Sequence, residues 1–240
     1  MFFSNEVGIP FESFSLLHLL LFVFIAIGVT AIVLLRDNLR SWRFERRLAI
    51  GLASFALLWE FALYAWKVGN GIWTWDDGLP LGLCGLTLYL GMFAMFFHNK
   101  KAFLIGYFWT WGAIASVLFP DIGFSYDRFR FYQFMFGHMF FFFLYMYMIF
   151  VYRWVPSWKD YLRSLVILFV IGMIFLVVSH LTDTNLMFMV ESEGTPLSMF
   201  EGGSYLWYVT GTIGLSAVVM AVWMLPFQLQ ATLLKQKVNQ

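Results

Sequence analysis

The stretch FSLLHLLLFVFIAIGVTAIVLL, residues 14–35, determines the structural class of this protein. It holds one ionisable side chain, His18, and it is long enough to cross the roughly 30 Å of hydrocarbon in a bilayer as a helix. Its apolar residues are continuous and do not alternate with polar ones, as they would in the wall of a β-barrel. Because backbone groups in lipid must be satisfied inside the segment, this stretch predicts a transmembrane α-helix.

Similar apolar runs recur along the chain, and they leave no room for a water-soluble domain. We expect seven spans, near residues 14–35, 48–66, 79–97, 102–119, 131–151, 161–181 and 204–226. Hydrophobic residues make up 61% of the chain and charged residues 12%, too few charges for the surface of a soluble domain. The sequence therefore predicts one domain, residues 1–240, that is an all-α polytopic membrane protein with a bundle of about seven transmembrane helices.

The basic side chains are divided unequally between the two sets of loops. Of the 15 lysines and arginines, 12 lie on one side: Arg36, Arg40, Arg43, Arg46, Arg47, Lys100, Lys101, Arg153, Lys159, Arg163, Lys235 and Lys237. Only Lys67, Arg128 and Arg130 lie on the other side. By the positive-inside rule the N-terminus is expected outside and the C-terminus in the cytoplasm, which requires an odd number of spans.

Composition also limits the partners. A net charge of +1 with no long basic stripe argues against nucleic acid, so membrane lipids are the expected partners, and protein partners stay open. We find no nucleotide-binding glycine loop, HExxH motif or zinc-ligand spacing, and we expect neither cofactor nor metal. The single cysteine, Cys84, is available for packing or for thiol chemistry but not for an intramolecular disulfide.

Ionisable groups inside the spans point to the outer half of the bundle. At 1.5 Å per residue, His18, Glu60, Cys84 and His138 lie within about 10 Å of the outer ends of four different spans. Such groups are costly in hydrocarbon and commonly mark a site, although near the interface they can also simply bind water or headgroups. A carboxylate at the depth of Glu60 needs a partner, and the candidates are His138, His18 and Tyr64.

Two further residues, Asp121 and His180, sit at the outer ends of the fourth and sixth spans. Cysteine–histidine chemistry needs a thiolate, a base and a group that orients the base. Cys84, His138, and Glu60 or Asp121 are the candidates for these catalytic roles. The residues expected to contact a substrate are His18, Tyr64, His180, Asn185 and Trp207.

The surroundings of these residues suit a lipid chain. Pro80 is expected in the first turn of the third span, and Gly82 and Gly85 would allow close approach to its backbone. The fifth span is almost wholly aromatic or sulfur-bearing around His138, which suits either core packing or an acyl-chain wall. The long connection 182–204 contains an apolar stretch and is the candidate lid over the bundle.

The order of several motifs resembles that of the YwaF-like integral membrane proteins of Gram-positive bacteria. The motifs are Phe14-Ser15-Leu16-Leu17-His18-Leu19, then Trp66, Gly71 and Trp73, Leu79-Pro80-Leu81-Gly82-Leu83-Cys84, Phe119-Pro120-Asp121, Arg128-Phe129-Arg130-Phe131, His138, Asn185, Pro196 and Trp207-Tyr208. That family is similar to eukaryotic transmembrane acyltransferases that remodel ether phospholipids through a cysteine and a histidine. The resemblance implies that Cys84 is the nucleophile and His138 the base, and that the chain lies in a bacterial plasma membrane. The family often has a histidine two residues before the cysteine, where this chain has Gly82, so no role transfers there.

The leading functional hypothesis is a lipid acyltransferase or acyl hydrolase that acts through Cys84 and His138 in the outer half of the bilayer. The alternative is a non-enzymatic seven-helix transporter, or a protein that binds a lipid or another small molecule in the same polar layer. A partner subunit without a pocket is a third possibility.

Overall fold

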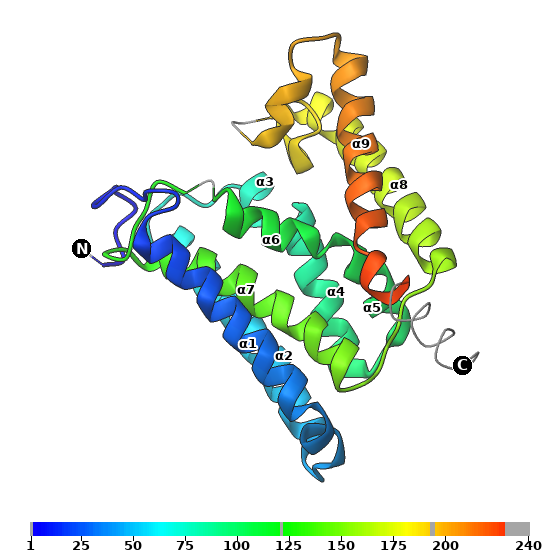
Figure 1. Cartoon of the computed structure of the whole chain (residues 1–240). Helices are drawn as coiled ribbons and strands as arrows, with labels where there is room; N and C mark the ends of the chain where they lie inside the picture. Colours follow the sequence, from blue (N-terminus) through cyan, green and yellow to red (C-terminus); the bar gives the residue numbers. More distant parts are fainter. Residues whose placement is uncertain (1, 121, 193–194, 229–240) are drawn as a thin grey trace.

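The chain folds into helices joined by short connections (Figure 1). The computed structural model describes residues 2–120, 122–192 and 195–228, and no β-strand occurs among them. The elements, with η marking 3-10 helices, are α1 (Leu16–Ser41), α2 (Glu45–Gly69), α3 (Trp75–Gly78), α4 (Leu83–Phe97), α5 (Lys100–Gly106), η1 (Tyr107–Trp109), α6 (Trp111–Leu118), α7 (Phe129–Phe150), α8 (Trp158–Thr182), η2 (Leu186–Phe188), η3 (Pro196–Phe200) and α9 (Tyr205–Val222). The predicted all-α membrane fold is confirmed.

Six helical segments in the described part of the chain are long and apolar enough to cross a bilayer. They are Leu16–Ser41, Glu45–Gly69, Lys100–Leu118, Phe129–Phe150, Trp158–Thr182 and Tyr205–Gln228. The third expected span corresponds to α4, which is apolar but has only 15 residues. At 1.5 Å per residue α4 is about 22 Å long, less than the thickness of the hydrocarbon core.

The helix in the third span begins later than the sequence predicted. Leu79 is extended, with φ −92° and ψ 153°, and Gly82 is the extended N-cap of α4. The expectation that Pro80 lies in the first turn is therefore wrong. The physical reason is that a proline disfavours helical backbone in the residue before it, so the chain stays extended and the helix starts at Leu83.

Tyr145 of α7 belongs to the main core and is fully buried. Its hydroxyl donates a 2.8 Å hydrogen bond to the carbonyl oxygen of Thr87 in α4. The ring fits because its neighbours are glycines: a Cβ at Gly106 would come within 1.9 Å of the Tyr145 hydroxyl, and one at Gly91 within 2.9 Å of the ring. The contact therefore fixes α7 against α4 and α5.

The helices form two groups in space. α1, α2 and α7 lie side by side with α4 behind them, whereas α8 and α9 form a hairpin on the other side of α5 (Figure 1). α8 packs on α5, and α9 packs on α8 and on the segment that contains η3. The described chain thus has an α1–α7 bundle and an α8–α9 hairpin that meet along α5.

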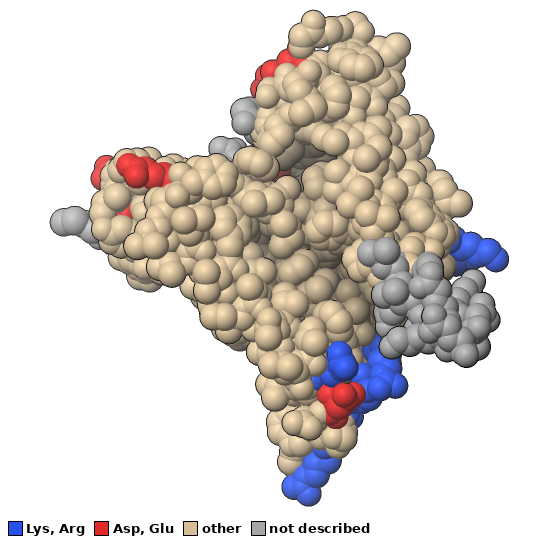
Figure 2. Space-filling model, viewed as in Figure 1, with Lys and Arg blue, Asp and Glu red and all other residues tan. Residues whose placement is uncertain are grey.

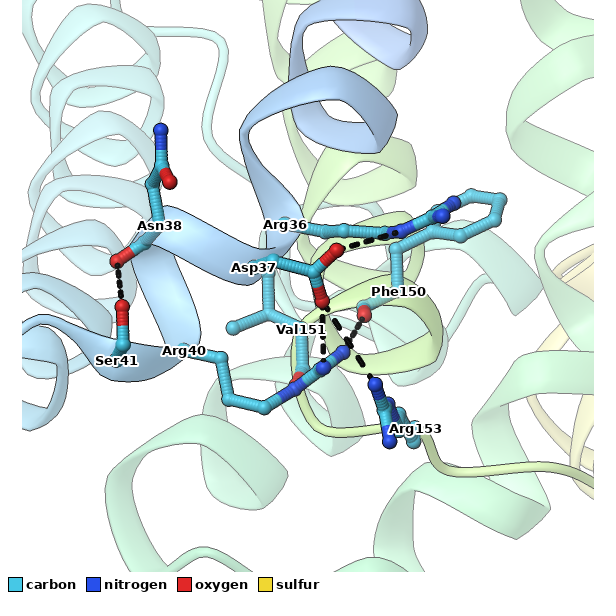
Figure 3. A network of polar contacts seen from close by, with 8 residues as sticks. All are labelled: Arg36, Asp37, Asn38, Arg40, Ser41, Phe150, Val151 and Arg153. Atoms are coloured by element: carbon cyan, nitrogen blue, oxygen red, sulfur yellow. Dashed lines mark hydrogen bonds and ion pairs between the residues drawn. The ribbon is translucent and has the colours of Figure 1, made fainter.

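Two arginines tie helix ends together at the end where α1 meets α2. Arg40 donates hydrogen bonds of 2.8 Å to the carbonyl oxygens of Phe150 and Val151, at the C-terminal end of α7, and pairs with Asp37 (Figure 3). Arg46 donates in the same way to the carbonyl oxygens of Met95 and Phe96 near the end of α4. The last carbonyls of a helix lack intrahelical donors, so both arginines satisfy them.

Charge is segregated along the molecule. On the face drawn in Figure 2, basic side chains gather at the end near the α1–α2 connection and the start of α8, and most acidic ones at the opposite end. This separation matches the loop-by-loop division of lysine and arginine in the sequence.

We predict that Arg40→Met lowers thermal stability in detergent or lipid by about 2–3 kcal/mol, because two carbonyls lose charged donors. The measurement is the unfolding midpoint of the purified protein. Arg36→Met is the matched control: Arg36 is more exposed and makes a single 3.6 Å ion pair with Asp37, which is worth under about 1 kcal/mol. Equal midpoints for the two variants would contradict this role for Arg40.

Candidate functional site

A cavity of about 970 Å³ lies between the bundle and the hairpin. Residues from α2, α3, α4, α6, α7, α8 and α9 line it, together with the segment that contains η2 and η3. Figure 2 shows a hollow between the two groups of helices on the drawn face. The volume is at the upper end for small-molecule sites, and such cavities usually combine apolar walls with a few placed polar groups.

The cavity has that mixed character. Its polar and charged lining residues are Glu60, Lys67, Asp76, Cys84, Ser116, Arg130, Gln133, His138, Asn185, Thr195, Thr212 and Ser216. Its aromatic lining residues include Trp59, Trp111, Phe119, Phe134, Phe140, Phe141, Phe169, Phe188 and Trp223. Cys84, His138 and Glu60, three of the four side chains expected to be catalytic, therefore share one cavity.

Cys84 is the second residue of α4. Its Sγ lies 3.6 Å from the hydroxyl oxygen of Ser116 in α6. A Cβ at Gly112, one turn earlier in α6, would sit 3.5 Å from the sulfur, so a larger residue there would crowd the thiol. The N-terminal turn of a helix stabilises negative charge, and the negatively charged thiolate is the form in which a cysteine reacts.

The start of α4 also presents backbone donors. Its N-cap, Gly82, makes no side-chain capping bond, and the first bond of the helix runs from Leu86 N–H to Gly82 O, at 3.0 Å. The N–H groups of residues 83–85 therefore precede the hydrogen-bond ladder. A Cβ at Gly82 would meet nothing within 4 Å, so the cavity is open beside these donors.

His138 is held in one tautomer by its own helix. Its Nδ1 lies 2.7 Å from the carbonyl oxygen of Phe134. A carbonyl only accepts, so Nδ1 carries the proton and the neutral ring keeps a basic lone pair on Nε2. The rings of Phe134 and Phe141 flank the imidazole, with centroids 4.3 and 5.5 Å away.

Cys84 and His138 approach the cavity from neighbouring helices that run in the same direction. The C-terminal ends of α4 and α7 both meet the α1–α2 end through Arg46 and Arg40. From the Tyr145–Thr87 contact, Cys84 lies about one turn back along α4 and His138 two turns back along α7. Both residues are thus displaced toward the same end of the bundle.

Of the three partners expected for Glu60, it is Tyr64 that interacts with it. Its carboxyl group is hydrogen-bonded to Tyr64, one turn further along α2, and Lys67 and Arg130 are the cations that act on it. The Tyr64 hydroxyl in turn lies 3.4 Å from that of Tyr89 in α4. Tyr64 therefore interacts with Glu60 but is not itself among the residues that line the cavity.

Sequence reasoning missed several polar residues of the wall. Arg130 donates to the side-chain oxygen of Gln133 and lies over the Phe134 ring, 5.3 Å from its centroid. Arg130 and Gln133 are spaced i, i+3 at the start of α7, a spacing that places both on one helix face. Ser116 had no comparable signal, because a serine within an apolar helix commonly bonds its own backbone.

His18 lies away from the cavity and is fully buried. Its Nε2–H donates to the carbonyl oxygen of Val117 at 2.6 Å, and its Nδ1 accepts from the Phe14 N–H at 2.8 Å. Phe14 has a φ of 61°, a left-handed conformation that this bond helps to hold. Both ring nitrogens are therefore used in joining the start of α1 to the end of α6.

The remaining expected site residues are divided. His180 is exposed and forms a 3.0 Å hydrogen bond with the Tyr205 hydroxyl. Trp207 is 55% exposed and its ring contacts that of Phe200. Neither residue lines the cavity. Asn185 does line it. Asp121 lies outside the described residues.

Described residues of the connection expected to act as a lid form part of the cavity wall. Residues 185–189 and 195–197 contribute to its lining. The Asn185 side chain binds the backbone of Val190 and Glu191, and the hydroxyls of Tyr205 and Tyr208 donate to the carbonyl oxygens of Met189 and Phe188. The Leu186 N–H also donates to Ser179 Oγ of α8, so this covering segment is held by its own bonds, by α8 and by α9.

We predict that His18→Leu lowers stability by about 1–3 kcal/mol, because it leaves the Phe14 N–H and the Val117 carbonyl without partners. The unfolding midpoint measures this loss. His180→Leu, at an exposed position, should stay within about 0.5 kcal/mol of wild type. A wild-type midpoint for His18→Leu would show that the two bonds have no structural role.

Comparison with known proteins agrees with the membrane fold. No curated protein and no solved structure matches the chain significantly. A family model does match residues 11–225, which is most of the chain and includes Cys84, His138 and all the helices that line the cavity. The match and the apolar helices together identify an integral, multi-pass membrane protein, and the chain belongs to the TMEM164 family.

Proposed function

We propose that this protein is a membrane-embedded acyltransferase or acyl hydrolase in which Cys84 carries the acyl group and His138 moves the proton. The observation behind the proposal is that the only cysteine of the chain and a histidine with a basic Nε2 line the same largely apolar cavity. The resemblance to YwaF-like proteins and to ether-lipid acyltransferases assigns the same two roles to these positions.

The first half-reaction forms a thioester. His138 Nε2 takes the proton from the Cys84 thiol, and Sγ bonds to the carbonyl carbon of a lipid ester. The developing oxyanion is stabilised by the free N–H groups in the first turn of α4. The ester C–O bond then breaks, and the proton on Nε2 passes to the departing oxygen, which leaves as an alcohol.

The second half-reaction reverses these roles. A hydroxyl of an acceptor lipid, or water, gives its proton to His138 Nε2 while its oxygen bonds to the acyl carbon. The C–S bond breaks and the proton returns to the sulfur, so the enzyme ends unchanged.

The group that orients the base differs from the sequence hypothesis. The Phe134 carbonyl already occupies Nδ1, so the proposal needs neither Glu60 nor Asp121 in that position. We assign Glu60 instead to the polar part of the cavity, where the positive charges of Lys67 and Arg130 attract its carboxylate. The aromatic wall would hold the acyl chain.

The proposal places this chemistry in the outer half of a bacterial plasma membrane. The N-terminus would be outside and the C-terminus in the cytoplasm, because the basic end of the molecule lies at the opposite end from Cys84. Residues 185–189 and 195–197 would then cover the cavity at the outer surface.

We predict that wild-type protein incubated with a phospholipid mixture gains an acyl mass that hydroxylamine removes. Cys84→Ser should lack this labile mass. His138→Ala should acquire it at least about 100-fold more slowly, since it loses the general base. Intact-mass spectrometry measures both.

His180→Ala is the matched control, because His180 is an exposed histidine outside the cavity. It should acylate at the wild-type rate. No adduct on wild type, with the lipids unchanged by chromatography, would reject the covalent mechanism for those lipids and favour a ligand-binding or transport protein.

A further inference from the structure

We propose that Ser116 is a positioning residue for Cys84: its hydroxyl holds the sulfur and donates a hydrogen bond to the thiolate. The inference extends the proposed function, in which that thiolate is the nucleophile. Its starting point is the 3.6 Å separation between Ser116 Oγ and Cys84 Sγ, which is within hydrogen-bond range for sulfur.

α6 is shaped to hold the sulfur. Gly112 and Ser116 are spaced i, i+4 and so lie on one face of α6. Gly112 leaves van der Waals room for Sγ, since a Cβ there would already be 3.5 Å away, and Ser116 supplies the polar contact. Both residues also line the cavity, so the sulfur sits between α6 and the substrate space.

The position of α6 is set from the adjoining turn. The Trp223 indole N–H donates to Thr110 Oγ at 3.0 Å, and the Tyr107 hydroxyl donates to the Trp223 carbonyl oxygen at 3.0 Å. These bonds join η1 and the residue before α6 to the end of α9. They fix the helix on which Gly112 and Ser116 face the thiol.

A serine hydroxyl suits both states of the sulfur. It can accept from the S–H group, and after the proton has moved to His138 Nε2 it can rotate and donate to S⁻. An anion in an apolar cavity is costly unless it has such a donor, and charge-assisted hydrogen bonds are the stronger kind. Ser116 neither gains nor loses a proton in this role.

The test uses the single cysteine, because thiol labelling then reports on Cys84 alone. The full-length protein in detergent is alkylated with N-ethylmaleimide over a range of pH, and labelling is followed by intact mass. Ser116→Ala should slow alkylation at neutral pH at least about tenfold, with the difference fading at high pH, where the thiol ionises without help. Ser116→Thr, which keeps the hydroxyl, should restore most of the rate.

Ser216→Ala is the matched control: Ser216 also lines the cavity, but its hydroxyl donates to the Thr212 carbonyl oxygen of its own helix, and alkylation should be unchanged. Removing the Ser116 oxygen widens access to the sulfur, so slower labelling cannot arise from blocked entry. Wild-type alkylation of Ser116→Ala across the pH range would overturn the inference.

The outcome is independent of the acyl-transfer assay. If wild type forms no labile acyl adduct but Ser116→Ala still slows alkylation, the proposed function fails while the role of Ser116 stands. If the adduct forms and alkylation of Ser116→Ala equals wild type, the role of Ser116 fails alone.

Discussion

The contact between Tyr145 and α4 is the constraint on which the site depends. Tyr145, in the C-terminal half of α7, reaches the backbone of α4 only because Gly91 and Gly106 leave room for its ring. Its hydroxyl uses the Thr87 carbonyl, so the contact sets the register between the two helices as well as their distance. That register places Cys84 and His138 toward the same end of the bundle, and both line the cavity.

Other contacts act at helix ends, where backbone groups lose their partners. Arg40 and Arg46 satisfy the last carbonyls of α7 and α4 at the basic end, and His18 links the start of α1 to the end of α6. At the start of α4, by contrast, Gly82 leaves the first N–H groups without a side-chain cap. An uncapped helix start beside a cavity can receive its missing hydrogen-bond acceptor from a ligand.

The division into a bundle and a hairpin gives the cavity its character. The bundle side carries the thiol, the imidazole and the charged groups, whereas the hairpin and its covering segment contribute mainly apolar walls. The covering segment is tied to α9 and α8. The hairpin is joined to the bundle by Trp223, which bonds Thr110 and Tyr107 just before α6, and by Ser164, which bonds Ile105 of α5. The contacts that place α6 beside Cys84 therefore depend on the hairpin staying against the bundle.

The sequence by itself determined the solvent and the fold class. Continuous apolar runs, the absence of alternation and the one-sided distribution of lysine and arginine depend on local composition, and a membrane leaves helices as the available structure. Local rules also indicated that Cys84, Glu60 and His138 are unusual, since each is a polar group at depth. Only the tertiary structure decided which polar groups line one cavity. His18 had the same local signal as His138, yet both of its ring nitrogens form hydrogen bonds that join α1 to α6. His138 bonds its own helix through Nδ1, so its Nε2 keeps an unshared lone pair, and the residue lines the cavity. The register of helices that are far apart in the chain decides which residues line the cavity. Ser116, Lys67 and Arg130 line it, whereas Trp207 and His180 do not. Helix packing depends on the fit of side chains such as Tyr145 against glycines on other helices, and no local pattern encodes that fit.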